Sequence, residues 1–176
     1  LGDVYKRQKQ RRRIATIKLQ QVTDKEQICQ VAQLADEIWH EHYQNILSPE
    51  QIDYMVERYQ SVQAITEQLE QGYHYLLALE DGQPCGFCGY HRETDRMFLS
   101  KIYIRKDFRR RGIASAFLKQ VTEESQGLAA IYLTVNKHNA GSIAAYQHFG
   151  FETIDSVVTD IGHGYVMDDF IMQKSL

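Results

Sequence analysis

The sequence predicts a single mixed α/β (α+β) domain in which helices flank one twisted sheet of about seven strands. The chain of 176 residues is long enough for one sizeable core. Apolar residues recur at helical spacing from about residue 24 to residue 72, and follow strand-like patterns after that. Two further helical segments separate the later strands, so the expected order is β-α-α-(α)-β-β-β-α-β-α-β-β.

Four segments are expected in the first part of the chain. A strand precedes a long helix, whose first turn contains the capping-box pair Thr23 and Glu26. Pro49 follows Ser48 and fits the first turn of a second helix, where a backbone N–H is not needed. The second and third helices are expected to form a hairpin. The segments are a strand over 14–22 and helices from about 24 to 43, from 48 onward, and from 61 to near 72.

Strand-like runs dominate after Gly72. Asp81 and Gly82 separate two such runs, which predicts a hairpin with a tight turn. The segment after Gly112 has apolar residues on one helical face. The expected strands are 73–80, 84–93, 97–104, 130–135, 152–161 and 165–174, and the expected helices are 113–125 and 140–149.

The composition is that of an ordinary globular protein, with 43% hydrophobic and 24% charged residues. No run approaches the ~18–20 apolar residues that span a bilayer, and no signal-peptide segment is present. Three cysteines, an odd number, argue against a disulfide framework. Cys85 and Cys88 form a C-x-x-C, but no second pair follows, which favours packed thiols over a metal site. We therefore expect a cytoplasmic protein with no metal and no membrane partner.

The first 13 residues differ in charge from the rest of the chain. They hold six basic residues against one acid, Asp3, whereas the remainder has 14 basic and 22 acidic residues. A basic arm can bind nucleic acid or a membrane surface. However, the chain lacks an initial Met, and residues 3–8 resemble the translation of a sequencing-library adapter. We expect residues 1–13 to be a disordered, non-native extension of a domain over 14–176, and therefore expect no nucleic-acid partner.

The most informative segment covers residues 99–114. An apolar strand ends in a basic loop, formed by Arg109, Arg110 and Arg111, which opens directly onto a helix at Gly112. A helix N-terminus leaves about four N–H groups without intrahelical partners and carries roughly half a positive charge. Glycine lets a ligand approach the backbone, and arginine adds charge that does not titrate. These features together predict a pyrophosphate site.

Arg109, Gly112 and Ala114 are spaced as R-x-x-G-x-A after a strand. This pattern resembles the coenzyme A-binding motif of the GNAT N-acetyltransferase superfamily, and the resemblance covers about residues 14–176, in outline only between 24 and 72. It implies a mostly antiparallel sheet, acetyl-CoA as cosubstrate, and a strand over 97–104 that splays from its neighbour. The implied contacts are the backbone of Ile102, Tyr103 and Ile104 for pantetheine, and Arg109, Arg110, Arg111, Gly112, Ile113, Ala114 and Ser115 for pyrophosphate.

A second block lies downstream at the distance that the family requires. It contains Asn139 and Tyr146, seven residues apart, and ends in Gly150-Phe151. This spacing puts both side chains on one face of a helix. The resemblance implies that Asn139 bonds the pantetheine region and that Tyr146 protonates the departing thiolate. A core position is the alternative for Tyr146.

The acceptor amine has to lose a proton, because an alkylamine with a pKa near 10.4 is almost fully protonated at neutral pH. A general base or a water chain is therefore expected. No glutamate lies in the strand over 97–104, where some family members have one. We favour Glu93 or a water relay. The other candidates are His91, Glu37, His40 and Glu41, and for each a surface or structural role is the alternative.

These inferences predict an acetyl-CoA-dependent N-acetyltransferase that acts on a primary amine by direct transfer in a ternary complex. The acceptor is a small amine, a polyamine, or a peptide or protein amine. The acidic body favours a cation, although mild acidity also serves solubility, and residues 37–43 are suited to line an acceptor pocket. The alternative is a non-catalytic coenzyme A-binding sensor or interaction module, against which Asn139 and Tyr146 argue. The family resemblance also implies a homodimer, although no residue pattern in the sequence requires one.

Overall fold

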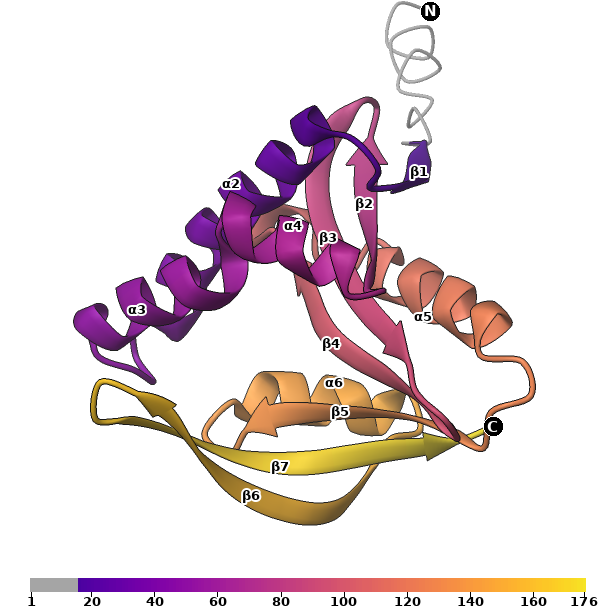
Figure 1. Ribbon diagram of the computed structural model, residues 1–176. Coiled ribbons are helices and arrows are strands. Elements are labelled where there is room, and N and C mark those ends of the chain that lie inside the picture. The colour runs from indigo at the N-terminus through magenta and orange to yellow at the C-terminus, as the bar shows by residue number, and fades with distance from the viewer. Residues whose placement is uncertain (1–15) are drawn as a thin grey trace, which may run out of the picture.

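One seven-stranded sheet organises the computed structural model, which describes residues 16–176 (Figure 1). The strand order is β1-β2-β3-β4-β5-β7-β6, and every neighbouring pair is antiparallel except β4 and β5. The strands are β1 (Ile17–Gln21), β2 (His74–Glu80), β3 (Gln83–Arg92), β4 (Arg96–Ile104), β5 (Ala130–Asn136), β6 (Glu152–Gly162) and β7 (Tyr165–Ser175). The predicted fold class is confirmed.

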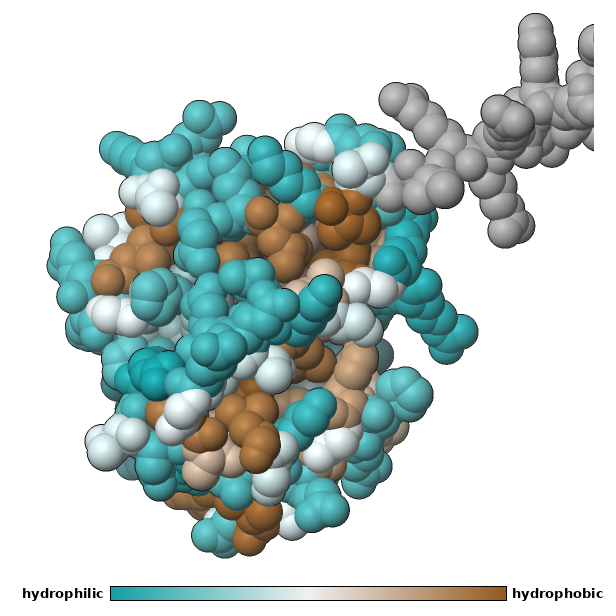
Figure 2. Space-filling model, turned by 90° about the vertical axis from the view of Figure 1, so that its right-hand side faces the viewer, coloured by the Kyte–Doolittle hydropathy of each residue, from teal (hydrophilic) through white to brown (hydrophobic). Residues whose placement is uncertain are grey.

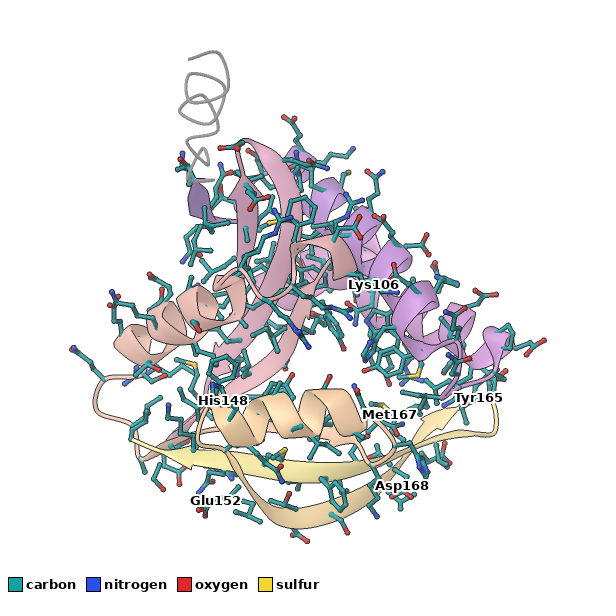
Figure 3. The ribbon with its side chains drawn as sticks, turned by 180° about the vertical axis from the view of Figure 1, so that it is seen from behind. Lys106, His148, Glu152, Tyr165, Met167 and Asp168 are labelled. Atoms are coloured by element: carbon teal, nitrogen blue, oxygen red, sulfur yellow. The ribbon has the colours of Figure 1, made fainter. Side chains whose placement is uncertain are left out.

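Helices cover both faces of this sheet (Figures 1 and 3). Three helices from the first half of the chain lie on one face, and two from the second half lie on the other. They are α2 (Lys25–Tyr43), α3 (Pro49–Gln60), α4 (Val62–Glu70), α5 (Ile113–Glu124) and α6 (Ala140–His148), with a short 3₁₀ turn, η1, at Lys106–Phe108. Each predicted helix and strand within 16–176 is present, with bounds that differ by a few residues at most.

The start of α2 differs in detail from the prediction. Asp24, not Thr23, is the N-cap residue, and its carboxylate accepts the N–H of Gln27 at 2.9 Å. The Gln27 side chain in turn accepts the N–H of Asp24 at 3.2 Å, which completes a capping box one residue later than expected. Asp is at least as good an N-cap as Thr, and the Gln27 amide also accepts the N–H of Thr23. The predicted extension over 1–13 lies outside the described residues.

The core forms on both faces of the sheet. On the α5 face, Phe117 and Val121 pack with strand residues that include Ile131, and all three are fully buried. On the opposite face, Val31 and Ile65 from α2 and α4 are also fully buried, and pack on the residues of β2 and β3. Close packing of these side chains thereby fixes the helices on the two faces of the sheet.

The two cysteines of the C-x-x-C lie in β3 and form no disulfide. Both are fully buried. Burial raises the pKa of Cys85 to about 11 and raises that of Cys88 further. Thiols in this state are poor nucleophiles.

On the side of the molecule that carries α5, the surface is largely hydrophilic and apolar residues show as separate patches (Figure 2). The large apolar side chains that are exposed include Ile154 and Val158 on β6 and Val166 on β7. Within residues 16–176, no helix is long and apolar enough to cross a bilayer.

β4 and β5 run parallel but stay paired over only three residues each. Arg96–Phe98 pair with Ala130–Tyr132, after which the two strands diverge. A bulge lies at this point, because Leu99 pairs with Tyr90 and Lys101 pairs with Gly89, which leaves Ser100 without a partner on β3. The edge of β4 that faces β5 is therefore unpaired from Leu99 to Ile104. The splay implied by the family resemblance is present.

Candidate active site

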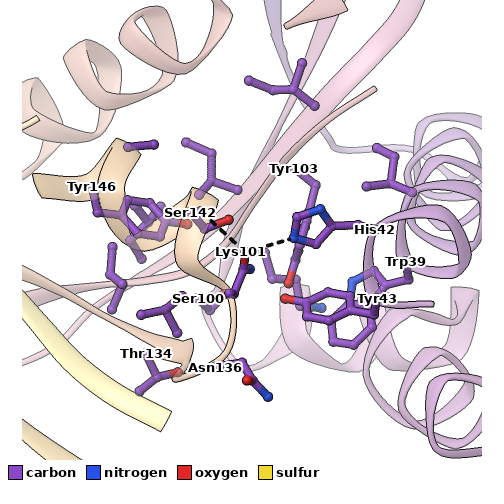
Figure 4. Close-up of a pocket in the computed structure, with 18 of the residues that line it drawn as sticks. Trp39, His42, Tyr43, Ser100, Lys101, Tyr103, Thr134, Asn136, Ser142 and Tyr146 are labelled. Carbon is purple, nitrogen blue, oxygen red and sulfur yellow. Dashed lines mark hydrogen bonds between the residues drawn. The ribbon is translucent and has the colours of Figure 1, made fainter. Parts of the chain in front are cut away.

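A cavity of about 1400 Å³ occupies the space between the diverging strands. Side chains from α2 face those from α6 across it, with β4 and β5 between them (Figure 4). The start of α5 closes one end, and β6 and β7 contribute to the wall at the other. The cavity is large enough for an extended ligand together with a second, smaller molecule.

The start of α5 presents three free backbone donors to this cavity. Gly112 is the N-cap residue and has a left-handed backbone conformation (φ 83°), which glycine adopts without strain. The first intrahelical bond runs from the N–H of Ala116 to the carbonyl of Gly112. The N–H groups of Ile113, Ala114 and Ser115 therefore have no intrahelical partner, and all three residues line the cavity. Free N–H groups at a helix N-terminus can bind an anion, and this is the place where the sequence predicts a pyrophosphate site.

The three arginines of the loop have different roles. Arg109 and Arg110 line the cavity, and the Nε of Arg109 donates to the carbonyl of Ile104 at 3.3 Å. Arg111 instead forms an ion pair with the buried Glu80 at 2.6 Å and packs over the ring of Phe108. Its guanidinium is thus directed to the end of β2 and does not line the cavity. The prediction that Arg111 contacts a ligand receives no support from its side chain.

The three predicted pantetheine-binding residues form the open edge of β4. Ile102 and Ile104 pack against the core on the α5 face, whereas Tyr103 packs among the aromatic residues on the α2 face. All three line the cavity. Core packing and backbone recognition are therefore compatible here, because the side chains are used for packing and this edge pairs with no strand among residues 16–176. The Ile104 carbonyl already accepts the hydrogen bond from Arg109.

Asn139 is the N-cap of α6 and is 4% exposed. Its Oδ1 accepts the N–H of Ser142 at 3.4 Å and lies 3.2 Å from the Nε2 of His42 (Figure 4). Asn139 thereby joins α6 to the end of α2. Burial, followed by the charge of Arg109, lowers the pKa of His42, so its ring is neutral at neutral pH.

Tyr146 is half-buried in the last turn of α6, lines the cavity and packs edge-on against Phe151, with ring centroids 5.8 Å apart. The helix lies across β5 and β7, with His148 near one end and Met167 beside the other (Figure 3). Burial raises the pKa of Tyr146 above its usual value, so the phenol keeps its proton at neutral pH. It is therefore able to donate that proton to a group in the cavity.

Glu93 does not line the cavity. It follows β3, and its carboxylate accepts a hydrogen bond from the hydroxyl of Tyr132. The ring of Tyr132 stacks on Phe98, at the closed end of the gap between β4 and β5. The structure thus places Glu93 beyond the point where the two strands meet, away from the other predicted site residues.

Only some of the residues in the segment 37–43, which is predicted to line an acceptor pocket, face the cavity. Trp39, His42 and Tyr43 line the cavity, and the rings of Trp39 and Tyr43 stack with centroids 4.3 Å apart. Glu37 pairs with Arg105, and His40 contacts Asp53, so both face away from the cavity. The helical period, which separates the two sets of side chains, explains the division.

Two ionisable residues that line the cavity, Lys101 and Asp169, are not among the site residues predicted from the sequence. Lys101, in β4, is 8% exposed, and its Nζ donates to the hydroxyl of Tyr75 at 2.6 Å and to Gln68 at 3.0 Å. Burial lowers its pKa to about 7. Asp169, in β7, is 4% exposed. A charged residue inside an otherwise apolar strand was the available signal for both.

Comparison with known proteins agrees with this geometry. The sequence model described as "Acetyltransferase (GNAT) family" matches residues 30–151, which is more than half of the chain. The ribosomal protein bS18-alanine N-acetyltransferase of Escherichia coli (strain K12) is 31% identical over 85 residues. That alignment covers 46% of this chain and 57% of the relative, so the chain spans less than two thirds of the curated relatives it matches.

Solved structures show the same fold at low identity. The PaiA N-acetyltransferase of Thermoplasma acidophilum, solved in complex with coenzyme A, superposes with a TM-score of 0.76 at 21% identity, covering 92% of this chain and 99% of that one. The ribosomal-protein-S18-alanine N-acetyltransferase of Escherichia coli gives 0.66 at 16% identity, covering 91% and 94%. Family match, fold and cavity agree, and this chain belongs to the GNAT acetyltransferase family.

Proposed function

We propose that the protein transfers an acetyl group from acetyl-CoA to a primary amine, with both substrates bound at once. The observation that supports this most is the gap between β4 and β5, which opens directly onto the free N-terminus of α5. A ligand with an anionic head and an extended amide-bearing arm fits this combination, because the head meets free N–H donors and the arm meets an unpaired strand edge.

The residues present suit acetyl-CoA along its length. Backbone N–H groups of Ile113, Ala114 and Ser115, with the charges of Arg109 and Arg110, would hold the pyrophosphate. The β4 edge would bond the pantetheine amides. When bound, acetyl-CoA supplies an activated acyl group as a thioester.

Acetyl transfer requires a proton donor at the thioester sulfur and a hydrogen-bond donor at the thioester carbonyl. Tyr146 is protonated at neutral pH and lines the cavity, which supports the proposal that it protonates the leaving thiolate. A backbone N–H of β4 near the bulge at Ser100 would polarise the carbonyl, since the bulge leaves this stretch of backbone without a regular partner. Holding both substrates in line supplies much of the remaining acceleration.

The alternative function is coenzyme A binding without catalysis. This function needs the part of the cavity proposed to hold coenzyme A, but it needs neither an acceptor site nor a proton donor. The aromatic wall of Trp39, Tyr43 and Tyr103 on the far side of the cavity and the position of Tyr146 favour the enzyme. The bS18-alanine N-acetyltransferase acts on a protein alanine, so a peptide N-terminus belongs among the proposed acceptors together with small amines and polyamines.

The proposal is tested by thermal unfolding with acetyl-CoA, coenzyme A and ATP, followed by thiol release from acetyl-CoA with a panel of amines. Both coenzyme A forms should raise the unfolding midpoint, because ligands of the native state stabilise it by mass action, and ATP should not. At least one amine should then accelerate thiol release. Shifts without thiol release from any amine would favour the non-catalytic alternative, and no shift would reject both.

Gly112→Asp should weaken acetyl-CoA binding by tenfold or more, since it places a negative charge at the anion site. A Cβ at Gly112 meets no atom within 4 Å, so the fold should tolerate the change apart from the strain of a positive φ. Gly164→Asp is a matched control, with φ 76° and equally open space in the β6–β7 turn. Calorimetric titration with acetyl-CoA gives the comparison. Equal affinities for the two variants would contradict the pyrophosphate assignment.

Tyr146→Phe should lower kcat by roughly 100-fold, at the low end for a proton donor because a thiol of pKa near 8.5 leaves readily. The acetyl-CoA dissociation constant should stay within about twofold, since the ring and its packing on Phe151 remain. Steady-state thiol release and calorimetry measure the two quantities. Glu93→Gln serves as the comparison variant, and a loss of kcat there but not in Tyr146→Phe would assign the chemistry to Glu93.

A further inference from the structure

The cavity is electrostatically asymmetric. Arg109 and Arg110 lie at the α5 end, together with the helix N-terminus. Among the residues of 16–176 that line the cavity, the only carboxylate is that of Asp169, which comes from β7. Asp169 pairs in register with Asn136 of β5 and Val157 of β6, both of which also line the cavity. One end is therefore suited to an anion, and the β7 wall carries a single buried acid.

The alternation of β7 separates Asp169 from its neighbour. Asp168 forms an ion pair with Lys137 at 2.8 Å, and its side chain is 45% exposed. Lys137 also lies over the ring of Phe170, the next residue that shares the Asp168 face. Met167 and Asp169 share the opposite face, and both line the cavity. Asp168 thus has a partner outside the cavity, whereas Asp169 is directed into it.

The Asp169 carboxylate lacks a partner in the described part of the chain. The residue is 4% exposed, and its buried Oδ1 accepts no hydrogen bond. Burial and the charge of Asp168 raise its pKa to about 6, against the opposing effect of Lys137. Burial raises the pKa values of the Tyr43 and Tyr103 phenols, and the charge of Asp169 adds to that effect, so both phenols lie close to the carboxylate. Most of the carboxyl is ionised at neutral pH, and although the charge of Lys137 acts on it, no cation of residues 16–176 forms an ion pair with it.

An unpaired buried carboxylate costs stability, so its presence in a cavity indicates a ligand that compensates the charge. The surrounding wall is aromatic. Trp39 stacks on Tyr43 and lies 5.7 Å from the ring of Tyr103. The Nε1 of Trp39 is also buried without a partner in the described residues. A carboxylate beside aromatic faces attracts an alkylammonium group, by charge and by cation–π interaction.

We propose that Asp169 binds the acceptor as a primary alkylammonium ion and takes its proton, which deepens the proposed function and rests on it. The acceptor class is then a cationic primary amine, held between Asp169 and the Trp39–Tyr43 wall. This role belongs to neither of the bases favoured from the sequence, because Glu93 lies outside the cavity and a water relay needs a group at its end.

The step balances without a further reactant. The ammonium passes one proton to Asp169, and the amine nitrogen forms a bond to the acetyl carbonyl carbon. The carbon–sulfur bond breaks, and the thiolate receives the proton of Tyr146. The second proton that the nitrogen loses on becoming an amide restores Tyr146 through the cavity solvent, and Asp169 releases its proton to bulk water. The net products are the N-acetylated amine, coenzyme A and one proton.

His42 and Lys101 are the competing bases, and the Nζ of Lys101 is already hydrogen-bonded to Tyr75 and Gln68. For His42 the argument is different. Its ring is neutral and lines the cavity, but its Nε2 lies 3.2 Å from the Oδ1 of Asn139. This contact assigns Nε2 as the donor and ties the ring to the N-cap of α6. The contact accounts for one nitrogen of His42, whereas the buried Oδ1 of Asp169 accepts no hydrogen bond from any of the described residues. His42→Gln therefore belongs in the test.

The test measures acetyl transfer by the full chain carrying Asp169→Asn, Asp169→Glu, Asp168→Asn or His42→Gln. The acceptors are n-butylamine, 1,4-diaminobutane and an alanine-first tripeptide, with n-butanol as the uncharged counterpart. Asp169→Asn should lower kcat/KM for the amines by about 100-fold or more, with the acetyl-CoA dissociation constant within about twofold of wild type. Asp169→Glu should retain part of the activity, and Asp168→Asn should stay within about threefold.

Each contrary result has a distinct meaning. Amine kcat/KM within threefold of wild type in Asp169→Asn overturns the inference, as does a loss confined to His42→Gln. A wild type that binds acetyl-CoA but acetylates none of the three amines overturns the acceptor class. A wild type that fails to bind acetyl-CoA rejects the proposed function itself, and is told apart by the calorimetric titration, which contains no amine.

A stability measurement separates this role from a structural one. The folded pKa of Asp169 lies above the unfolded value, so the folded state binds more protons between about pH 4 and pH 6 and loses stability as pH rises through that window. Asp169→Asn should therefore raise the unfolding midpoint at pH 8 by a few degrees and change it little at pH 4.5. A lower midpoint at pH 8 would show that Asp169 has a structural partner, which contradicts the inference.

Discussion

β4 and β5 share backbone hydrogen bonds over only three residue pairs, and the site depends on where that pairing stops. A longer ladder would bring the strands to the usual spacing of about 4.8 Å and leave no cavity between them. The bulge at Ser100 lies where the strands part, and bulges increase local twist. The helices then complete the walls, with α2 on one face of the sheet and the start of α5 together with α6 on the other (Figure 1).

Within residues 16–176, this arrangement leaves several polar groups without a hydrogen-bonding partner. The edge of β4 from Leu99 to Ile104, the first N–H groups of α5 and the carboxylate of Asp169 all lie around one cavity. Unsatisfied groups of this kind lower stability and are uncommon elsewhere in folded proteins. Their concentration here is what a binding site for an anionic chain and a cationic partner requires, and the two buried clusters on either face supply the compensating stability.

Much of this could be predicted from the sequence. Local patterns determined each helix and strand within the described residues, and the strand–loop–Gly112 motif located the free helix N-terminus because that chemistry is contiguous in the chain. Properties that depend on tertiary contacts could not be predicted. Nothing in the sequence distinguishes Arg111 from Arg109 and Arg110, because only the fold brings Glu80 next to it. Glu93 lies in the right strand region but at the closed end of the gap, and Asp169 gains its position only when β7 inserts between β5 and β6.

The central claim is that the opened edge of β4 and the start of α5 together hold acetyl-CoA. Amide hydrogen exchange of the full chain, with and without acetyl-CoA, tests it most directly. At saturation, exchange should slow by roughly tenfold or more in residues 99–104 and 113–116, while β1 and the start of β2 change little. Protection confined to other segments, or no protection at either place, would contradict the account.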